Sequence, residues 1–152
     1  MRKVNLVLIT MAAAVAIIMT ACDKEGGNRT NISQTGGRSH NTGRNCMDCH
    51  VSGGEGSGWF TAAGTVYDTA ETATYSNTVV QLYTQPRGGG QLVATLYGDA
   101  KGNFYTTASI DFSNGLYPAV TGTGRTNYMA VSITQGACNG CHGVSTLGIY
   151  AN

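Results

Sequence analysis

The chain has 152 residues with a formal net charge of +1, and 11% of its residues are charged. This charge excludes a polybasic nucleic-acid-binding protein and a strongly acidic tail. Glycine contributes 22 residues and proline only 2, which favours a β-rich, turn-rich protein over a helical one. The length suits one domain with tails, and the five cysteines are an odd number.

Residues 1–21 have the layout of a secretory signal peptide. A basic start precedes an uncharged apolar run from Val4 to Met19, which is short for a membrane span, although an N-terminal membrane anchor is an alternative. The sequence MTAC, which ends in Cys22, resembles the bacterial lipobox. This resemblance implies cleavage before Cys22 and lipid attachment to its sulfur. We therefore expect an exported lipoprotein, held on the periplasmic face of a membrane or on the outer cell surface.

Two glycine-rich segments follow the lipobox. Residues 22–45 contain Ile32 as their only aliphatic residue, so they cannot bury a core, and we expect a flexible tether. Residues 46–58 contain two cysteines and a histidine and end in the sequence GGEGSG (residues 53–58). We expect that ending to be a second hinge.

Residues 59–134 consist of short runs in which apolar and polar residues alternate, separated by turn sequences such as PRGGG and DAKG. This pattern predicts a mainly β fold, a small antiparallel β-sandwich. Pro118 places its own run at a sheet edge or at the start of a strand. The expected strands cover residues 60–67, 78–84, 91–97, 103–109, 116–121 and 128–133.

Part of this domain is similar to a known sandwich family. The sequences GTVYD (64–68), NTVVQL (77–82) and DAKGNF (99–104) resemble the carboxypeptidase regulatory-like, transthyretin-like sandwich. The resemblance implies an Ig-like or transthyretin-like fold of seven strands with a scaffolding role. The chemistry then has to lie outside the sandwich.

The remaining four cysteines form two C-x-x-C-H motifs, CMDCH from residue 46 and CNGCH from residue 138, which lies in the final segment, 135–152. This spacing is the attachment signature of c-type haem, because two thiols can bond one haem edge while the next imidazole reaches the iron. The sequence therefore predicts two covalently bound c-type haems. The expected thioether residues are Cys46, Cys49, Cys138 and Cys141, and the expected proximal iron ligands are His50 and His142.

Three other uses of the cysteines are a single Cys₄ zinc site, two redox-active disulfides and purely structural disulfides. None of them explains a histidine after each pair. The motifs resemble those of multihaem c-type cytochromes. The resemblance implies an electron carrier whose partners are redox proteins or extracellular acceptors, with no role for nucleic acid. A dihaem enzyme, for instance peroxidase-like with one open iron, is the alternative, and a haem-carrying adhesion module is a third hypothesis.

The sixth iron ligands separate electron transfer from enzymatic chemistry. His40 is the only histidine outside the motifs, and it is a candidate distal ligand for either haem or for a haem of a neighbouring copy. The alternative for His40 is a solvated tether residue. Met129 and Met47 are the thioether candidates, although Met129 also suits packing in the last strand.

The two motifs bracket the sandwich, so the number of strands bears on their separation. An odd number of alternating strands places them at opposite ends of a body about 20 Å long, and an even number places them side by side. The odd case leads to a head-to-tail homo-polymer in which haems of different copies meet.

Overall fold

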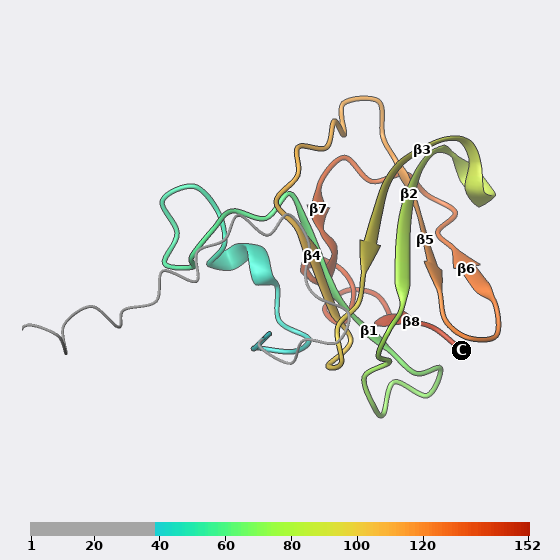
Figure 1. Ribbon diagram of the computed structural model, residues 1–152, viewed down its shortest axis with the longest axis horizontal. Coiled ribbons are helices and arrows are strands. Elements are labelled where there is room, and N and C mark those ends of the chain that lie inside the picture. Colours follow the sequence, from blue (N-terminus) through green and yellow to red (C-terminus); the bar gives the residue numbers. More distant parts are fainter. Residues whose placement is uncertain (1–38) are drawn as a thin grey trace, which may run out of the picture.

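The computed structural model describes residues 39–152, so the predicted signal peptide and the predicted lipidation site Cys22 lie outside the described residues (Figure 1). The expected mainly β fold is confirmed: the chain forms a small β-sandwich. The strands are β1 (Ala62–Tyr67), β2 (Val79–Gln85), β3 (Gly89–Tyr97), β4 (Asn103–Thr106), β5 (Tyr117–Thr121), β6 (Thr126–Tyr128), β7 (Gly136–Ala137) and β8 (Ile149–Tyr150). Three 3₁₀ turns accompany them, η2 (Cys46–Asp48), η3 (Pro86–Gly88) and η4 (Cys138–Gly140).

The strands form two four-stranded sheets. One sheet has the order β3-β2-β5-β6 and is antiparallel throughout. In the other, β4 pairs antiparallel with β1, whereas β7 and β8 both pair with β1 in parallel. The final segment of the chain therefore contributes two strands to the sandwich.

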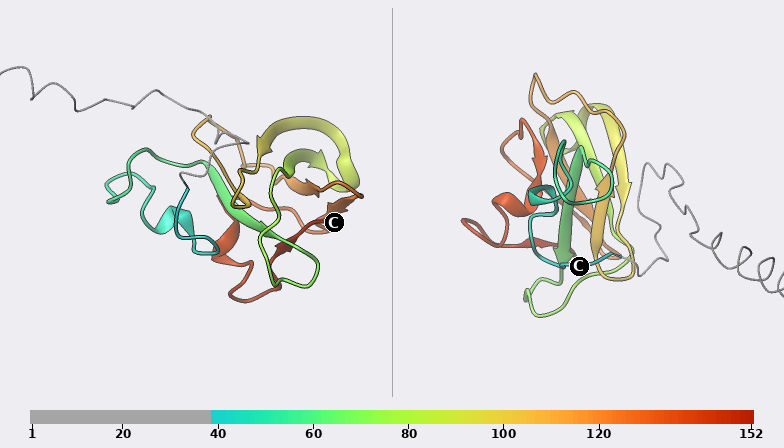
Figure 2. Two further views of the ribbon diagram at one scale, coloured as in Figure 1. Left: turned by 60° about the horizontal axis from the view of Figure 1, so that its bottom comes forward. Right: turned by 90° about the vertical axis from the view of Figure 1, so that its left-hand side faces the viewer.

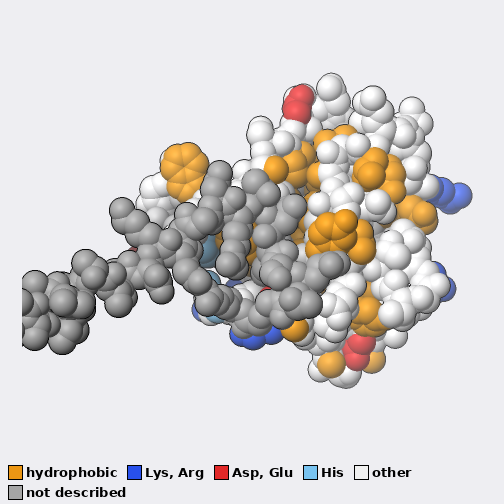
Figure 3. Space-filling view, in the orientation of Figure 1, with side chains coloured by type: hydrophobic (Ala, Val, Ile, Leu, Met, Phe, Trp, Pro, Cys, Tyr) orange, Lys and Arg blue, Asp and Glu red, His pale blue; other side chains and the backbone are white. Residues whose placement is uncertain are grey.

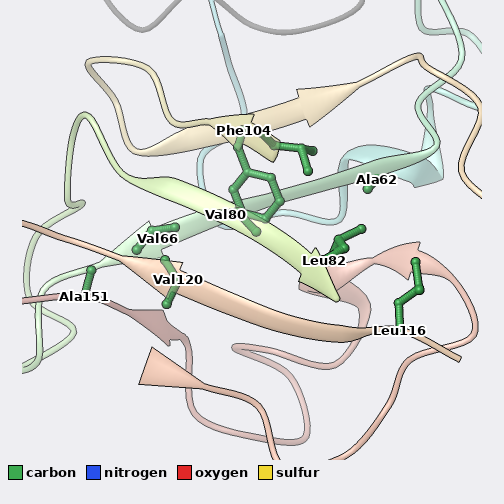
Figure 4. Packing of buried hydrophobic residues seen from close by; sticks show 9 residues of the cluster. Ala62, Val66, Val80, Leu82, Phe104, Leu116, Val120 and Ala151 are labelled. Carbon is green, nitrogen blue, oxygen red and sulfur yellow. The ribbon is translucent and has the colours of Figure 1, made fainter. Parts of the chain in front are cut away.

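The core lies between the sheets, and period-2 alternation on the strands explains its composition. On β2, Val80 and Leu82 are buried while the residues between and beside them are only partly covered. Phe104 on β4 is 1% exposed, and burying an aromatic side chain of this size stabilises the fold by roughly 1.5–3 kcal/mol. Figure 4 shows these side chains meeting from both sheets. The buried cluster is Ala62, Val66, Val80, Leu82, Leu96, Phe104, Leu116, Val120 and Ala151.

The strand predicted over residues 103–109 ends earlier, at Thr106, and two further predictions differ from the structure. The run predicted as a strand over residues 128–133 is mostly loop, and the strand there is β6, which ends at Tyr128. Pro118 is the second residue of β5, which pairs with both β2 and β6. The expected strand start is therefore right and the expected edge position is wrong. The missing N–H of proline costs least near a strand end.

The outer surface carries few charges. On β3, Leu92 is 50% exposed and Val93 is 41% exposed. Figure 3 shows apolar side chains scattered among uncharged polar groups, with charged side chains toward the rim of this face. Within residues 39–152, no helix is long and apolar enough to cross a membrane.

The strand-parity rule does not hold in this fold. Seven strands, β1 to β7, separate the two C-x-x-C-H motifs in the chain. However, β1 and β7 are parallel neighbours, with Ala62 opposite Gly136. Because β7 has only two residues and pairs with the start of β1, η4 begins beside β1 on the side of the first motif, and both views of Figure 2 show η2 and η4 next to each other.

Candidate haem sites

Both C-x-x-C-H motifs fold into the same backbone turn. In the first, the His50 N–H donates to the Cys46 carbonyl at 3.0 Å, and in the second, the His142 N–H donates to the Cys138 carbonyl at 3.0 Å. Each second cysteine caps its 3₁₀ turn in a right-handed helical conformation. The sequences flanking the two motifs differ, so the shared turn comes from the motif itself.

Each motif histidine is oriented through its Nδ1 atom. The Nδ1 of His50 lies 3.1 Å from the Ser57 carbonyl oxygen and 3.2 Å from that of Gly58. The Nδ1 of His142 lies 2.7 Å from the Leu147 carbonyl oxygen. A carbonyl can only accept a hydrogen bond, so these contacts place the proton on Nδ1 and leave the Nε2 lone pair for a metal. Sequence reasoning did not identify these carbonyls, because backbone acceptors carry no sequence signal.

The four cysteines of the described residues are free thiols. Cys49 and Cys141 are exposed, whereas Cys46 and Cys138 are partly buried. Burial raises the pKa of the Cys138 thiol to about 12, and the neighbouring Cys46 adds to this shift. Burial also raises the pKa of the Cys46 thiol. Each motif therefore combines one exposed thiol with one that is partly buried.

The glycine-rich segment 53–58 is a folded loop over His50, which corrects the expected hinge. The Gly56 N–H donates to the Cys49 carbonyl at 2.9 Å, and the Phe60 N–H donates to the His50 carbonyl at 2.9 Å. A Cβ on Gly56 would lie 2.7 Å from the His50 Cγ atom. Glycine is therefore required here for close approach to the imidazole.

Aromatic rings flank the first site. The rings of His40 and His50 have centroids 5.9 Å apart. On His50, Phe60 stacks at 4.1 Å, and Tyr105 stacks on Phe60 at 4.1 Å. The structure thus brings the candidate distal ligand His40 to the first motif within the same chain. Trp59, another aromatic close to this motif, is 63% exposed.

Residues 39–45 are held against the sandwich, which corrects the expected tether over this part of residues 22–45. The Gly43 N–H donates to the Thr65 Oγ1 atom at 2.9 Å, and the Asn139 side chain donates to the Gly43 carbonyl at 3.2 Å. Polar contacts hold this segment, and a prediction based on the lack of apolar residues does not take such contacts into account.

A cavity of about 410 Å³ lies beside the second motif. Its wall includes Cys138, Cys141, His142 and Met129, together with core side chains of the sandwich. The Met129 N–H donates to the Pro118 carbonyl at 2.9 Å, just beyond the end of β6. The structure therefore places the thioether candidate Met129 and the proximal candidate His142 on the same cavity. Free thiols, an oriented imidazole and a largely apolar wall fit a covalently attached haem.

The two sites are neighbours across β1. A Cβ on Gly64 of β1 would lie 3.0 Å from the Cys138 Cβ, and the Thr65 N–H donates to the Asn139 side chain at 2.7 Å. Asn139, between the cysteines of the second motif, is 2% exposed, and sequence reasoning missed its role. In residues 39–152, no group of three or more His, Cys, Asp or Glu side chains is arranged to hold a metal ion.

Comparisons with known proteins identify no relative: no family model, no curated protein and no solved structure matches this chain.

Proposed function

We propose that this protein is a dihaem c-type cytochrome, an exported lipoprotein that is anchored through Cys22 and carries electrons. The observation that supports this most is the repeated geometry of the two C-x-x-C-H turns. In each, Nδ1 of the histidine faces a backbone carbonyl, which leaves Nε2 for iron. A Cys₄ zinc site or a pair of disulfides does not require that orientation.

The chain supplies complete attachment sites for two haems. When bound, each haem provides an iron that accepts and releases one electron. The chain's own residues attach and orient the two groups and limit the access of water to them. The thioether residues are Cys46, Cys49, Cys138 and Cys141, and the proximal ligands are His50 and His142.

The sixth-ligand candidates favour electron transfer. His40 lies beside His50, and Met129 lies on the cavity of His142, so each site has one candidate distal ligand. Iron with two protein ligands has no free position for a substrate. The enzyme alternative keeps one supporting observation, the cavity of about 410 Å³ beside His142, which is in the size range of small-molecule sites.

The contact of the two sites across β1 bears on the route of electrons. It supports transfer between two haems of one molecule, and then to a redox protein or an extracellular acceptor. The head-to-tail homo-polymer was expected from motifs at opposite ends of the sandwich. The two-residue β7 pairs with the start of β1, so the motifs are neighbours, and this ground no longer supports the homo-polymer.

Haem content and spin state test this function. The chain, purified from a host that attaches haem to C-x-x-C-H motifs, should contain two haems by the pyridine haemochrome assay and show low-spin spectra. The double variant Cys46→Ala/Cys49→Ala should keep one haem, and so should Cys138→Ala/Cys141→Ala. A high-spin iron that binds CO or peroxide in the intact chain would favour the enzyme. A haem-free chain that binds zinc would overturn the proposal.

A further inference from the structure

The geometry points to Asn139, a residue of the second haem motif, as a positioning residue for His40 at the first motif. This inference rests on the proposed function. It adds a coupling between the two sites, because the turn of the second motif also holds the segment around Gly43. That segment carries His40, the candidate distal ligand of the first haem.

Asn139 forms hydrogen bonds through both ends of its amide. Its Oδ1 accepts from the Thr65 N–H at 2.7 Å, and its Nδ2 donates to the Gly43 carbonyl at 3.2 Å. Asn139 is 2% exposed, and Thr65 is fully buried. A buried amide with both partners in place connects rigid β1 to the segment before the first motif.

Gly43 is held on its other side as well. Its N–H donates to the Thr65 Oγ1 atom, which in turn donates to Asn103 Oδ1 at 2.6 Å. Its φ of +80° lies in the left-handed region, and a Cβ there would collide with the Tyr67 hydroxyl group. Glycine suits this backbone conformation. The hydrogen bonds of its N–H and carbonyl groups hold the peptide groups on both sides of Gly43.

The residues nearest His40 are anchored from the same network. Asn103 Nδ2 donates to Ser39 Oγ at 2.8 Å and to Thr42 Oγ1 at 3.2 Å, while Ser39 Oγ donates to the buried Asp99 carboxylate. The Lys101 ammonium group also donates to the Ser39 carbonyl at 2.6 Å. His40 therefore lies between an anchor directly before it and two anchors two and three residues after it.

His40 itself is exposed, so packing of its own side chain does not set its position. Its place beside His50 follows from the anchors on either side. Asn139 is the one anchor that belongs to the other haem motif, within η4 between Cys138 and Cys141. A change at residue 139 should therefore alter the ligation of the first haem while both haems stay attached.

Four variants of the haem-loaded chain test this inference. His40→Ala removes the candidate ligand, and Asn139→Ala removes both hydrogen bonds. Asn139→Asp keeps the acceptor for Thr65 but loses the donor to Gly43. Asn114→Ala is the matched control, because Asn114 is exposed in a turn on another part of the sandwich. The readouts are haem per chain, the high-spin optical signal and the number of CO molecules bound.

We expect His40→Ala to keep two haems and to bind one more CO per chain than the wild type. Both Asn139 variants should keep two haems and gain a CO-binding, high-spin fraction that free imidazole abolishes, while Asn114→Ala matches the wild type. Imidazole binding shows that the high-spin fraction comes from a vacant axial position on the iron. Wild-type spectra in both Asn139 variants, or an unchanged CO count in His40→Ala, would overturn the inference and leave the dihaem cytochrome intact. A wild-type chain without haem would instead overturn the proposed function.

Discussion

The imidazole rings of His40 and His50 lie next to each other, with centroids 5.9 Å apart. The contact is within one chain, so in the proposed cytochrome both candidate axial ligands of the first haem come from the same copy. At the second site, Met129 lines the cavity that His142 also lines. These two relationships lead to separate predictions.

Met129→Leu should change the second haem alone. Loss of a thioether ligand removes a group that raises the potential of haem iron, and leucine keeps the apolar volume. We expect the midpoint potential of one haem to fall by on the order of 0.1 V, within the roughly 0.8 V that axial ligands span, or that haem to become high-spin. A spectroelectrochemical titration measures both effects. Met47→Leu is the control, and equal shifts in the two variants would contradict ligation by Met129.

Gly56→Ala should disturb the first site through steric contact with His50. The added methyl group would lie 2.7 Å from two atoms of the imidazole ring. We expect a loss of about 1–3 kcal/mol in the free energy of unfolding, measured by denaturant titration of the haem-loaded protein. Gly140→Ala in the second motif is the matched control, because its Cβ would meet its nearest neighbour at an ordinary 3.7 Å. Equal stability of the two variants would show that the loop over His50 is not tightly packed.

Thiol reactivity in the haem-free chain should differ within the second motif. Cys141 is exposed, whereas burial raises the pKa of Cys138 to about 12. The thiolate is the reactive form, so iodoacetamide at pH 8 should label Cys141 well before Cys138. Mass spectrometry of the peptide that contains both residues gives the order of labelling. Faster labelling of Cys138 would contradict the burial of its thiol.

The Cys138 thiol should also make the free energy of unfolding of the haem-free chain fall at alkaline pH. Below the ordinary thiol pKa of 9.0, Cys138 is protonated in both the folded and the unfolded chain. Between that value and the folded-state pKa of about 12, only the unfolded chain loses the proton, so stability falls as the pH rises. In the haem-loaded chain the thioether sulfur has no proton to lose. Urea titrations between pH 8 and pH 11 should therefore show a steeper decline without haem, and parallel declines would contradict this origin.

The sequence was sufficient to predict most of the sandwich, because strands such as β2 follow period-2 alternation and end at turn sequences. It could not predict the parallel pairing of Ala62 with Gly136, which joins residues far apart in the chain through backbone hydrogen bonds. The motifs are neighbours despite the seven strands between them, because β7 has only two residues and pairs with the start of β1.

For the candidate sites, the sequence predicts the residues of the two motifs but not the segments that surround them. The C-x-x-C-H spacing predicts the cysteines and the proximal histidines of the proposed haem sites, and the structure shows the same backbone turn in both motifs. The glycine loop over His50 and the segment around Gly43 were both predicted to be flexible, because they contain few apolar residues. Hydrogen bonds to backbone groups and to Asn139 hold them, and such partners follow from the fold rather than from composition.

The most direct test of the two haem sites is the intact mass of the chain, purified from a host that attaches c-type haem, followed by mass mapping of its peptides. We predict a mass increase of two haems, with one haem on the peptide that contains CMDCH and one on the peptide that contains CNGCH. A chain of unmodified mass would contradict the account, as would two disulfides or a zinc ion at these cysteines.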